Sequence, residues 1–170
     1  MSLKLAKQVG NLLRSRGLFL ATAESCTGGL VGDWITNIPG SSDYYLGGVV
    51  AYANSAKMEL LGVPAGILAH YGAVSAEVVL EMARGARNLL KRNTPPERVV
   101  GLSVSGVAGP SGGTPEKPVG LVWVGLSGPD FERAYRFEWG GTRLENKRLS
   151  ARAALQALAD YLDKHVQEVG

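Results

Sequence analysis

The sequence has only one cysteine and two histidines among its 170 residues. A single cysteine, Cys26, cannot form an intrachain disulfide, which points to a reducing, cytoplasmic environment. Histidine is the commonest catalytic base, and the sequence has only His70 and His165 as candidates for that role. No pair of His or Cys residues stands at the spacing of a metal site. We therefore expect neither a disulfide scaffold nor a bound metal or cofactor.

Long hydrophobic runs are also absent. No apolar segment reaches the roughly 18 residues that a membrane-spanning helix needs. The N-terminal residues 1–4 begin an amphipathic helix and do not resemble a signal peptide. No repeat, linker or low-complexity segment divides the chain. We expect a cytoplasmic protein without a membrane partner, folded as a single domain over residues 1–170.

Charge of one sign is nowhere strongly concentrated. The net charge is +3, and only one segment is densely basic, with Arg143, Lys147, Arg148 and Arg152. No aromatic residues are interleaved with these cations, as they would be on a nucleic-acid surface. A solvated helix face is the favoured interpretation, and no nucleic-acid partner is expected.

Glycine, in contrast, is abundant, with 23 residues or about twice the usual share. One glycine-rich loop spans residues 106–118. It lacks the G-x-x-x-x-G-K-[ST] pattern of a nucleotide-binding P-loop and the G-x-G-x-x-G pattern of a dinucleotide site. Long loops in compact domains often carry function. The free N–H groups of this loop, together with Lys117, could hold a phosphate or a carboxylate.

Apolar periodicity predicts strands that alternate with helices for most of the chain. Helices are expected between the early strands, and the last two strands are expected to form a hairpin. The expected strands are residues 18–23, 47–53, 99–105, 119–127 and 131–139. This pattern is typical of a three-layer α/β/α sandwich with a mixed sheet.

Four helix starts carry capping signals. Thr27, Asn54 and Ser75 are expected N-caps, and Thr142 with Glu145 forms a capping box for a long last helix. The buried side of that last helix is expected to carry Leu149, Ala153, Leu158, Leu162 and Val166.

The segment Thr22–Gly29 carries the strongest indication of chemistry. Ser25 follows an apolar strand and comes directly before an expected helix start. The backbone N–H groups of Thr27, Gly28 and Gly29 would then be unpaired donors that could stabilise an oxyanion. The alternative is that Ser25 only helps to cap the helix.

A nucleophilic serine needs a base, and Lys57 is the candidate from the residues alone. It falls in the first turn of the helix that Asn54 is expected to cap, where a positive charge is disfavoured by about 0.3–1 kcal/mol. Lowering a lysine pKa from ~10.4 to ~8 takes roughly 3 kcal/mol, so burial must supply most of the shift. Two alternatives stay open: Lys57 is a solvated surface residue, or Cys26 is the nucleophile with help from His70.

Six segments, in their order along the chain, resemble the C-terminal domain family of the competence- and damage-inducible protein CinA, the nicotinamide-nucleotide amidohydrolases. The segments are Thr22–Gly29, Pro39–Ser42, Tyr52–Lys57, Gly72–Ser75, Ser105–Pro110 and Gly113–Gly120. The differences are mild, with valine at 107 where isoleucine is usual and serine at 111 where aspartate is common.

The resemblance implies hydrolysis of the carboxamide of nicotinamide mononucleotide to nicotinic acid mononucleotide and ammonia. It implies Ser25 as the nucleophile and Lys57 as the general base, with Tyr52 orienting Lys57. It further implies a cytoplasmic enzyme of pyridine nucleotide recycling that uses no cofactor and forms a homo-oligomer, with a dimer favoured.

The resemblance also implies which residues bind the substrate. We expect Thr27, Gly28 and Gly29 beside the amide, a hydroxyl at Ser105 that bonds Lys57 or the substrate, Gly106 next to it, and Arg143 on the phosphate. Two alternatives remain: a non-catalytic nucleotide-binding or regulatory module, and an amidase based on Cys26.

Overall fold

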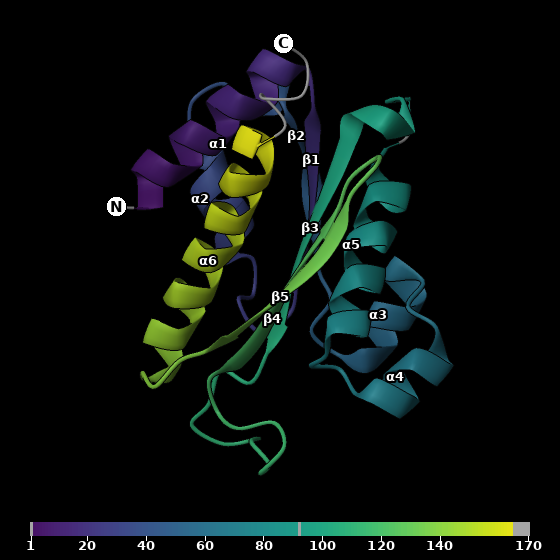
Figure 1. Ribbon diagram of the computed structural model, residues 1–170, viewed down its shortest axis with the longest axis vertical. Helices are drawn as coiled ribbons and strands as arrows, with labels where there is room; N and C mark the ends of the chain where they lie inside the picture. The colour runs from purple at the N-terminus through teal and green to yellow at the C-terminus, as the bar shows by residue number, and fades with distance from the viewer. Residues whose placement is uncertain (1, 92, 165–170) are drawn as a thin grey trace.

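The computed structural model describes residues 2–91 and 93–164, which form one five-stranded mixed sheet (Figure 1). The strand order is β2-β1-β3-β4-β5. Strand β1 pairs in parallel with β2 and β3, and β4 pairs antiparallel with β3 and β5. The strands are β1 (Phe19–Glu24), β2 (Tyr45–Val50), β3 (Val99–Gly106), β4 (Leu121–Ser127) and β5 (Glu132–Glu138).

Helices cover both faces of this sheet. Helices α1, α2 and α6 pack on one face and α3, α4 and α5 on the other, as Figure 1 shows. The helices are α1 (Ser2–Arg16), α2 (Leu30–Thr36), α3 (Asn54–Leu61), α4 (Ala65–Tyr71), α5 (Ala76–Leu90) and α6 (Arg143–Lys164), with 3₁₀ turns at Ser41–Asp43 and Pro96–Arg98. The predicted α/β/α sandwich is confirmed. None of the helices within the described residues has the length and apolarity to cross a membrane.

The central strands β1 and β3 are buried on both faces. All residues of β3 except Gly106 are buried, and so are the last five residues of β1. The reason is that each face of the sheet has its own apolar cluster, one beneath α1, α2 and α6 and the other beneath α3 to α5. The carboxyl ends of β1 and β3 therefore emerge side by side from a rigid core.

Two of the expected helix caps are confirmed. The Ser75 hydroxyl accepts the Val78 N–H at 3.3 Å and begins α5. Thr142 and Glu145 form the reciprocal capping box of α6. The Thr142 N–H donates to the Glu145 carboxylate at 2.8 Å, and the Glu145 N–H donates to the Thr142 hydroxyl at 3.4 Å.

The other two caps were predicted wrongly. Helix α2 begins at Leu30, and its N-cap is Gly29, which has no side chain to bond the first turn. Thr27 lies in the turn before the helix. The N–H groups of Gly29 and Val31, which a capping side chain could have bonded, donate instead to the carboxylate of Glu24. Asn54 is the first residue of α3, and Ala53 precedes it without a capping side chain.

One strand boundary and the burial of one residue on α6 also differ from expectation. Strand β2 covers Tyr45–Val50 instead of residues 47–53, because the chain bends after Val50 toward the start of α3. On α6, Leu158 and Leu162 are buried as expected, whereas Leu149 is 37% exposed. The expectation for Val166 lies outside the described residues.

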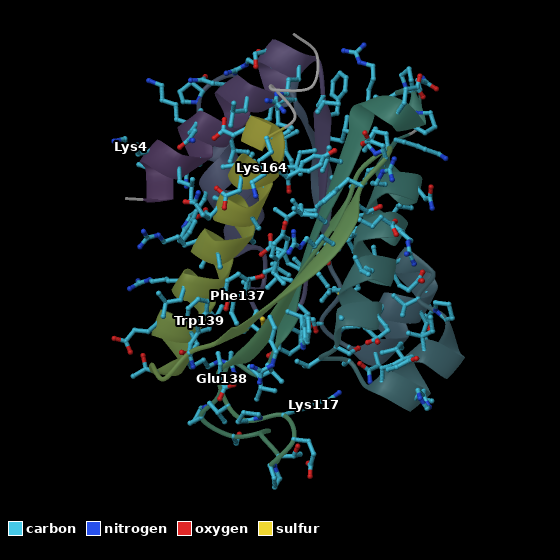
Figure 2. The ribbon with its side chains drawn as sticks, viewed as in Figure 1. Lys4, Lys117, Phe137, Glu138, Trp139 and Lys164 are labelled. Carbon is cyan, nitrogen blue, oxygen red and sulfur yellow. The ribbon has the colours of Figure 1, made fainter. Side chains whose placement is uncertain are left out.

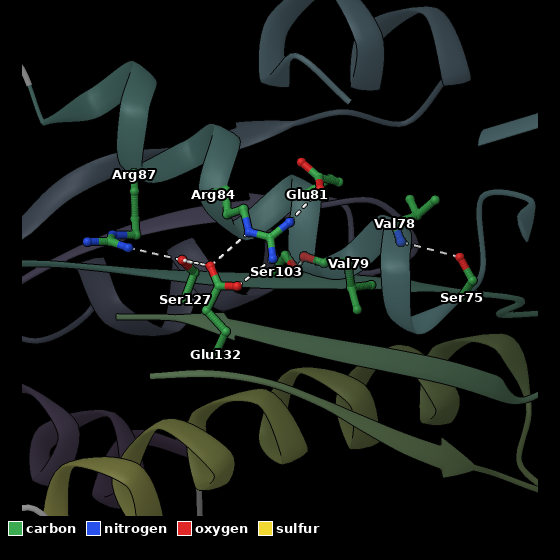
Figure 3. A network of polar contacts seen from close by, with 9 residues as sticks. All are labelled: Ser75, Val78, Val79, Glu81, Arg84, Arg87, Ser103, Ser127 and Glu132. Atoms are coloured by element: carbon green, nitrogen blue, oxygen red, sulfur yellow. Dashed lines mark hydrogen bonds and ion pairs between the residues drawn. The ribbon is translucent and has the colours of Figure 1, made fainter. Parts of the chain in front are cut away.

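A polar network ties α5 to the β4–β5 hairpin (Figure 3). The Arg84 guanidinium donates to Glu132 at 2.8 Å and also contacts Glu81. The Ser127 hydroxyl donates to Glu132 at 3.0 Å and accepts from Arg87 at 3.1 Å. This network lies on the face of the sheet that α5 covers, and it fixes the hairpin against that helix.

Candidate active site

A pocket of about 220 Å³ opens at the carboxyl ends of β1 and β3. This end of the strands is where open α/β sheets usually bind their ligands. The pocket is lined by Ser25, Cys26, Tyr52, Asn54, Lys57, Ala73, Val74, Ser105, Gly106, Ala108 and Arg143. Residues distant in sequence thus meet because β1 and β3 are neighbours and α3, α5 and α6 begin at the same edge.

Ser25 and Lys57 are hydrogen-bonded to each other in this pocket. Ser25 comes directly after β1, and its N–H donates to the Val104 carbonyl at 2.9 Å, which fixes the residue to β3. The side-chain nitrogen Nζ of Lys57 lies 3.1 Å from the Ser25 Oγ. The same nitrogen donates to the carbonyls of Ala51 at 3.0 Å and Tyr52 at 3.1 Å.

The environment of Lys57 disfavours its positive charge. The side chain is only 1% exposed, and its three hydrogen-bond partners are all neutral. Burial lowers the pKa of Lys57 below its ordinary value, because desolvation penalises the ammonium form. Lys57 also lies in the first turn of α3, where the helix dipole opposes a cation. The amine can therefore accept a proton from Ser25 at a lower pH than a solvated lysine could.

Cys26 lines the same pocket but has a different electrostatic character. Its thiol is 6% exposed, and burial raises its pKa to about 12, which suppresses the thiolate. His70 does not line the pocket; it is exposed on α4 and packs edge-on against Tyr71. The structure therefore does not bring Cys26 and His70 together. His165 lies outside the described residues.

The turn that follows Ser25 differs from the expected oxyanion site. The Gly28 N–H donates to the Ser25 carbonyl at 3.1 Å, and the Gly29 N–H donates to the Glu24 carboxylate at 3.1 Å. Both donors are thus engaged within the protein. In the described part of the chain, the N–H groups of Cys26 and Thr27 donate to no other residue. Of the three expected donors, only the Thr27 N–H has no acceptor among the described residues, and the Cys26 N–H, which contacts only its own thiol, is a second candidate.

Arg143 lies at the mouth of the pocket, at the start of α6. Its guanidinium donates to the Gly109 carbonyl at 2.7 Å and to the Tyr52 hydroxyl at 2.8 Å. Tyr52 therefore contacts Lys57 through its carbonyl and contacts Arg143 through its phenol, which is exposed to solvent. The expected pairing of Tyr52 with Lys57 exists, but it runs through the backbone.

Ser105 and Gly106, the last two residues of β3, line the pocket. The Ser105 hydroxyl donates to the Ala73 carbonyl at 2.7 Å, and it has no bond to Lys57. At Gly106 a Cβ would lie 2.5 Å from a methyl group of Val122, so only glycine fits between the strands.

The loop lysine Lys117 does not belong to the pocket. Its ammonium donates to the Tyr71 carbonyl, and the side chain lies toward the lower end of the molecule, as Figure 2 shows. The expected anion contact from Lys117 is therefore not made at this site. No cluster of three or more His, Cys, Asp or Glu residues that could hold a metal occurs within residues 2–91 and 93–164.

Sequence reasoning missed several pocket residues, among them Asn54 as a lining side chain and Ala73 and Val74 before α5. It also missed the structural role of Glu24. An acid at the end of an otherwise apolar strand, directly before Ser25, was the available signal, because a buried carboxylate requires hydrogen-bond donors.

Comparison with known proteins bears on the family of the chain and on its fold. The family model of the CinA C-terminal domain matches residues 2–162. The chain belongs to the CinA C-terminal domain family. Among its relatives, a putative competence-damage inducible protein from Halothermothrix orenii is 49% identical over 159 residues, covering 93% of this chain and 37% of that protein. A CinA-like protein from Salinibacter ruber is 49% identical over 148 residues, or 87% of this chain and 34% of that protein.

Solved structures of the CinA family share the whole fold. The competence damage-inducible protein A (ComA) from Klebsiella pneumoniae superposes with a TM-score of 0.86 at 32% identity, covering 95% of this chain and 97% of that one. The competence/damage inducible protein CihA from Agrobacterium tumefaciens gives a TM-score of 0.83 at 36% identity, with 95% of each chain covered. The chain thus spans just over a third of the Halothermothrix and Salinibacter relatives, but almost the full length of these crystallised proteins.

Proposed function

We propose that this CinA-family chain hydrolyses the carboxamide of nicotinamide mononucleotide and releases ammonia. The observation that carries the proposal is the contact between the Ser25 hydroxyl and a buried lysine amine, 3.1 Å apart, with no carboxylate of residues 2–91 or 93–164 bonded to the amine. A serine paired with a neutral lysine is a recognised nucleophile and base for acyl transfer. The resemblance of the surrounding segments to the nicotinamide-nucleotide amidohydrolases supports the choice of substrate.

In the first half of the proposed reaction, the Ser25 Oγ attacks the carboxamide carbon while neutral Lys57 takes the hydroxyl proton. The carbonyl oxygen becomes an oxyanion, and the free N–H groups of Cys26 and Thr27 are the donors for it. Lys57, now protonated, gives its proton to the departing nitrogen. Ammonia leaves, and an ester joins Ser25 to the nicotinoyl group.

In the second half, water takes the place of ammonia. Neutral Lys57 removes a proton from the water as its oxygen attacks the ester carbon. The tetrahedral intermediate collapses, the Ser25 oxygen leaves and is reprotonated by Lys57, and nicotinic acid mononucleotide is released. One lysine thus serves both steps, and neither step requires a metal or a cofactor.

The pocket has room near Lys57 for the pyridine carboxamide, and Arg143 supplies positive charge at its mouth. We propose that the phosphate of the substrate binds the Arg143 guanidinium, which presents several N–H donors in one plane. The carbonyl of Gly109 and the hydroxyl of Tyr52 already hold this guanidinium in place. The neutral amide and the anionic phosphate would then occupy opposite ends of the site.

The test is an ammonia-release assay with nicotinamide mononucleotide, other pyridine nucleotides and free nicotinamide. We expect turnover of the mononucleotide and an acyl-enzyme on Ser25 that mass spectrometry detects after rapid acid quenching. Tight binding of the mononucleotide without ammonia release would instead identify a non-catalytic nucleotide-binding module. Turnover that survives Ser25→Ala but not Cys26→Ala would transfer the nucleophile to the cysteine.

A further inference from the structure

Glu24 is a buried acid for which the proposed chemistry has no use. It is the last residue of β1, is 3% exposed and directly precedes Ser25. No lysine or arginine forms an ion pair with it among the described residues. An uncompensated buried carboxylate is costly, so its partners must be found elsewhere.

Those partners are backbone N–H groups at the start of α2. One carboxylate oxygen accepts from Gly29 at 3.1 Å and from Val31 at 3.0 Å, and the other accepts from Gly32 at 2.9 Å. The first turn of a helix has N–H groups without intrahelical partners, and these carry partial positive charge. Glu24 therefore compensates the helix start from a position outside the helix, across the turn that bears Ser25.

We infer that Glu24 is a positioning residue, whose carboxylate clamps the turn between β1 and α2 and so fixes the Ser25 hydroxyl against Lys57. This inference rests on the proposed role of Ser25 as the nucleophile. The turn is held at the β1 end by the Ser25 N–H bond to Val104 and at the α2 end by the carboxylate of Glu24. Without the second attachment, the nucleophile and the free N–H groups beside it would move together relative to Lys57.

The carboxylate lies in a closely packed place, and the length and the two acceptor oxygens of the side chain make the clamp specific for glutamate. At Gly32 a Cβ would lie 3.6 Å from the Glu24 oxygen and 2.8 Å from the Tyr45 hydroxyl. That hydroxyl is itself paired with Thr22 at 2.7 Å. Aspartate is one methylene shorter and cannot reach all three N–H groups from the same backbone position. Glutamine has the right length but turns an NH₂ group toward at least one N–H donor.

The test measures the reactivity of Ser25 independently of the natural substrate. A fluorophosphonate probe that phosphonylates reactive serines is applied to the wild type, Glu24→Gln, Glu24→Asp and the control Glu77→Gln, which alters an acid in the first turn of α5. Each protein is labelled well below its own melting temperature. We expect the rate of labelling at Ser25 to fall about 10- to 100-fold in both Glu24 variants and to stay within twofold in the control.

A second readout separates positioning from a general loss of structure. In the ¹⁵N-labelled wild type, the amide protons of Gly29, Val31 and Gly32 should be shifted downfield and slow to exchange. In Glu24→Gln these three signals should move, whereas amides of β4 and β5 should not. Turnover should show a lower kcat with a KM within about threefold of the wild type.

The possible failures are distinguishable. Labelling of both Glu24 variants at the wild-type rate would overturn the clamp and leave Ser25 as the nucleophile. If the wild type itself is not labelled at Ser25, the proposed nucleophile fails and the inference fails with it. If the variants do not fold, fast exchange of the Gly29, Val31 and Gly32 amides in the wild type would refute the clamp, and slow exchange would support it.

Discussion

Lys57 and Arg84 are two basic residues on the same side of the sheet, and their surroundings shift their pKa values in opposite directions. Lys57 is buried with neutral partners, and its pKa is lowered. Arg84 is partly exposed between Glu81 and Glu132, and hydrogen bonding to Glu132 raises its pKa. The difference is that Arg84 has carboxylate partners that favour its charge, whereas the partners of Lys57 are neutral, as the proposed role of Lys57 as a base requires.

The largest effect is expected from removal of either Ser25 or Lys57. Ser25→Ala and Lys57→Met should each lower kcat for amide hydrolysis by about 10³-fold or more, since each removes a group that acts in bond making. Far-ultraviolet circular dichroism should show an unchanged fold. Ser15→Ala and Lys7→Met, two exposed positions on α1, are matched controls that should keep full activity. Near-normal turnover of Ser25→Ala would rule out the serine mechanism.

A third cation, Arg143, belongs to neither class, because its partners are neutral but it faces the pocket mouth. Arg143→Met should raise KM for nicotinamide mononucleotide about 10- to 100-fold, as expected for loss of a hydrogen bond to a charged group. The substrate nucleoside, which has no phosphate, should show no such change. Arg148→Met, an exposed change on the same helix, is the control. An equal effect on both substrates would refute phosphate binding by Arg143.

Giving Lys57 a carboxylate neighbour should make it behave more like Arg84. Asn54 lines the pocket, and Asn54→Asp changes almost no volume. The proposed mechanism requires neutral Lys57, so activity should rise with pH through the lowered pKa of that amine. A nearby negative charge stabilises the ammonium form, so the rising limb should move upward by about half a pH unit. Asn88→Asp on α5 is the isosteric control. An equal shift of the rising part of the pH–activity profile in that variant would contradict its assignment to Lys57.

The smallest expected effect concerns Arg84. Glu132→Gln should lower the free energy of unfolding by about 1 kcal/mol, near the upper limit for exposed ion pairs, and leave turnover unchanged. Hydrogen bonding from Arg84 lowers the pKa of Glu132, so this stabilisation is complete above the ordinary value of 4.5 and is lost as pH falls through the lowered value. Glu138→Gln, in the exposed pair with Arg136, should cost less. Thermal melts of all three proteins at pH 7 and pH 3 measure both effects.

The elements that depend on local pattern were predictable from the sequence. The Ser75 cap and the Thr142–Glu145 capping box require only residues three apart, and the structure confirms both. The apolar runs of β1 and β3 likewise predict central strands, because burial on both faces removes polar residues from them.

The parts that depend on the folded arrangement were not predictable. The N-terminal cap of α2 comes from Glu24, which lies before the turn, so the local rule selected Thr27 instead. The burial of Lys57 arises only when α3 packs against α5 and the lysine reaches Ser25 after β1, and the residues beside Lys57 in the sequence do not indicate that packing. The bond between Arg143 and Tyr52 joins residues 91 positions apart, a distance over which periodicity gives no information.

Because Arg143 lines the pocket, the pocket can be completed only late in the synthesis of the chain. Ser25 and Lys57 lie in the first third of the chain, but the residue that closes the pocket mouth begins the last helix described. During translation, Ser25 and Lys57 emerge from the ribosome well before α6 is made. A nascent chain that ends before residue 143 would therefore contain Ser25 and Lys57 but lack the Arg143 contacts to Tyr52 and Gly109, and the lining of the pocket is complete only after α6 docks.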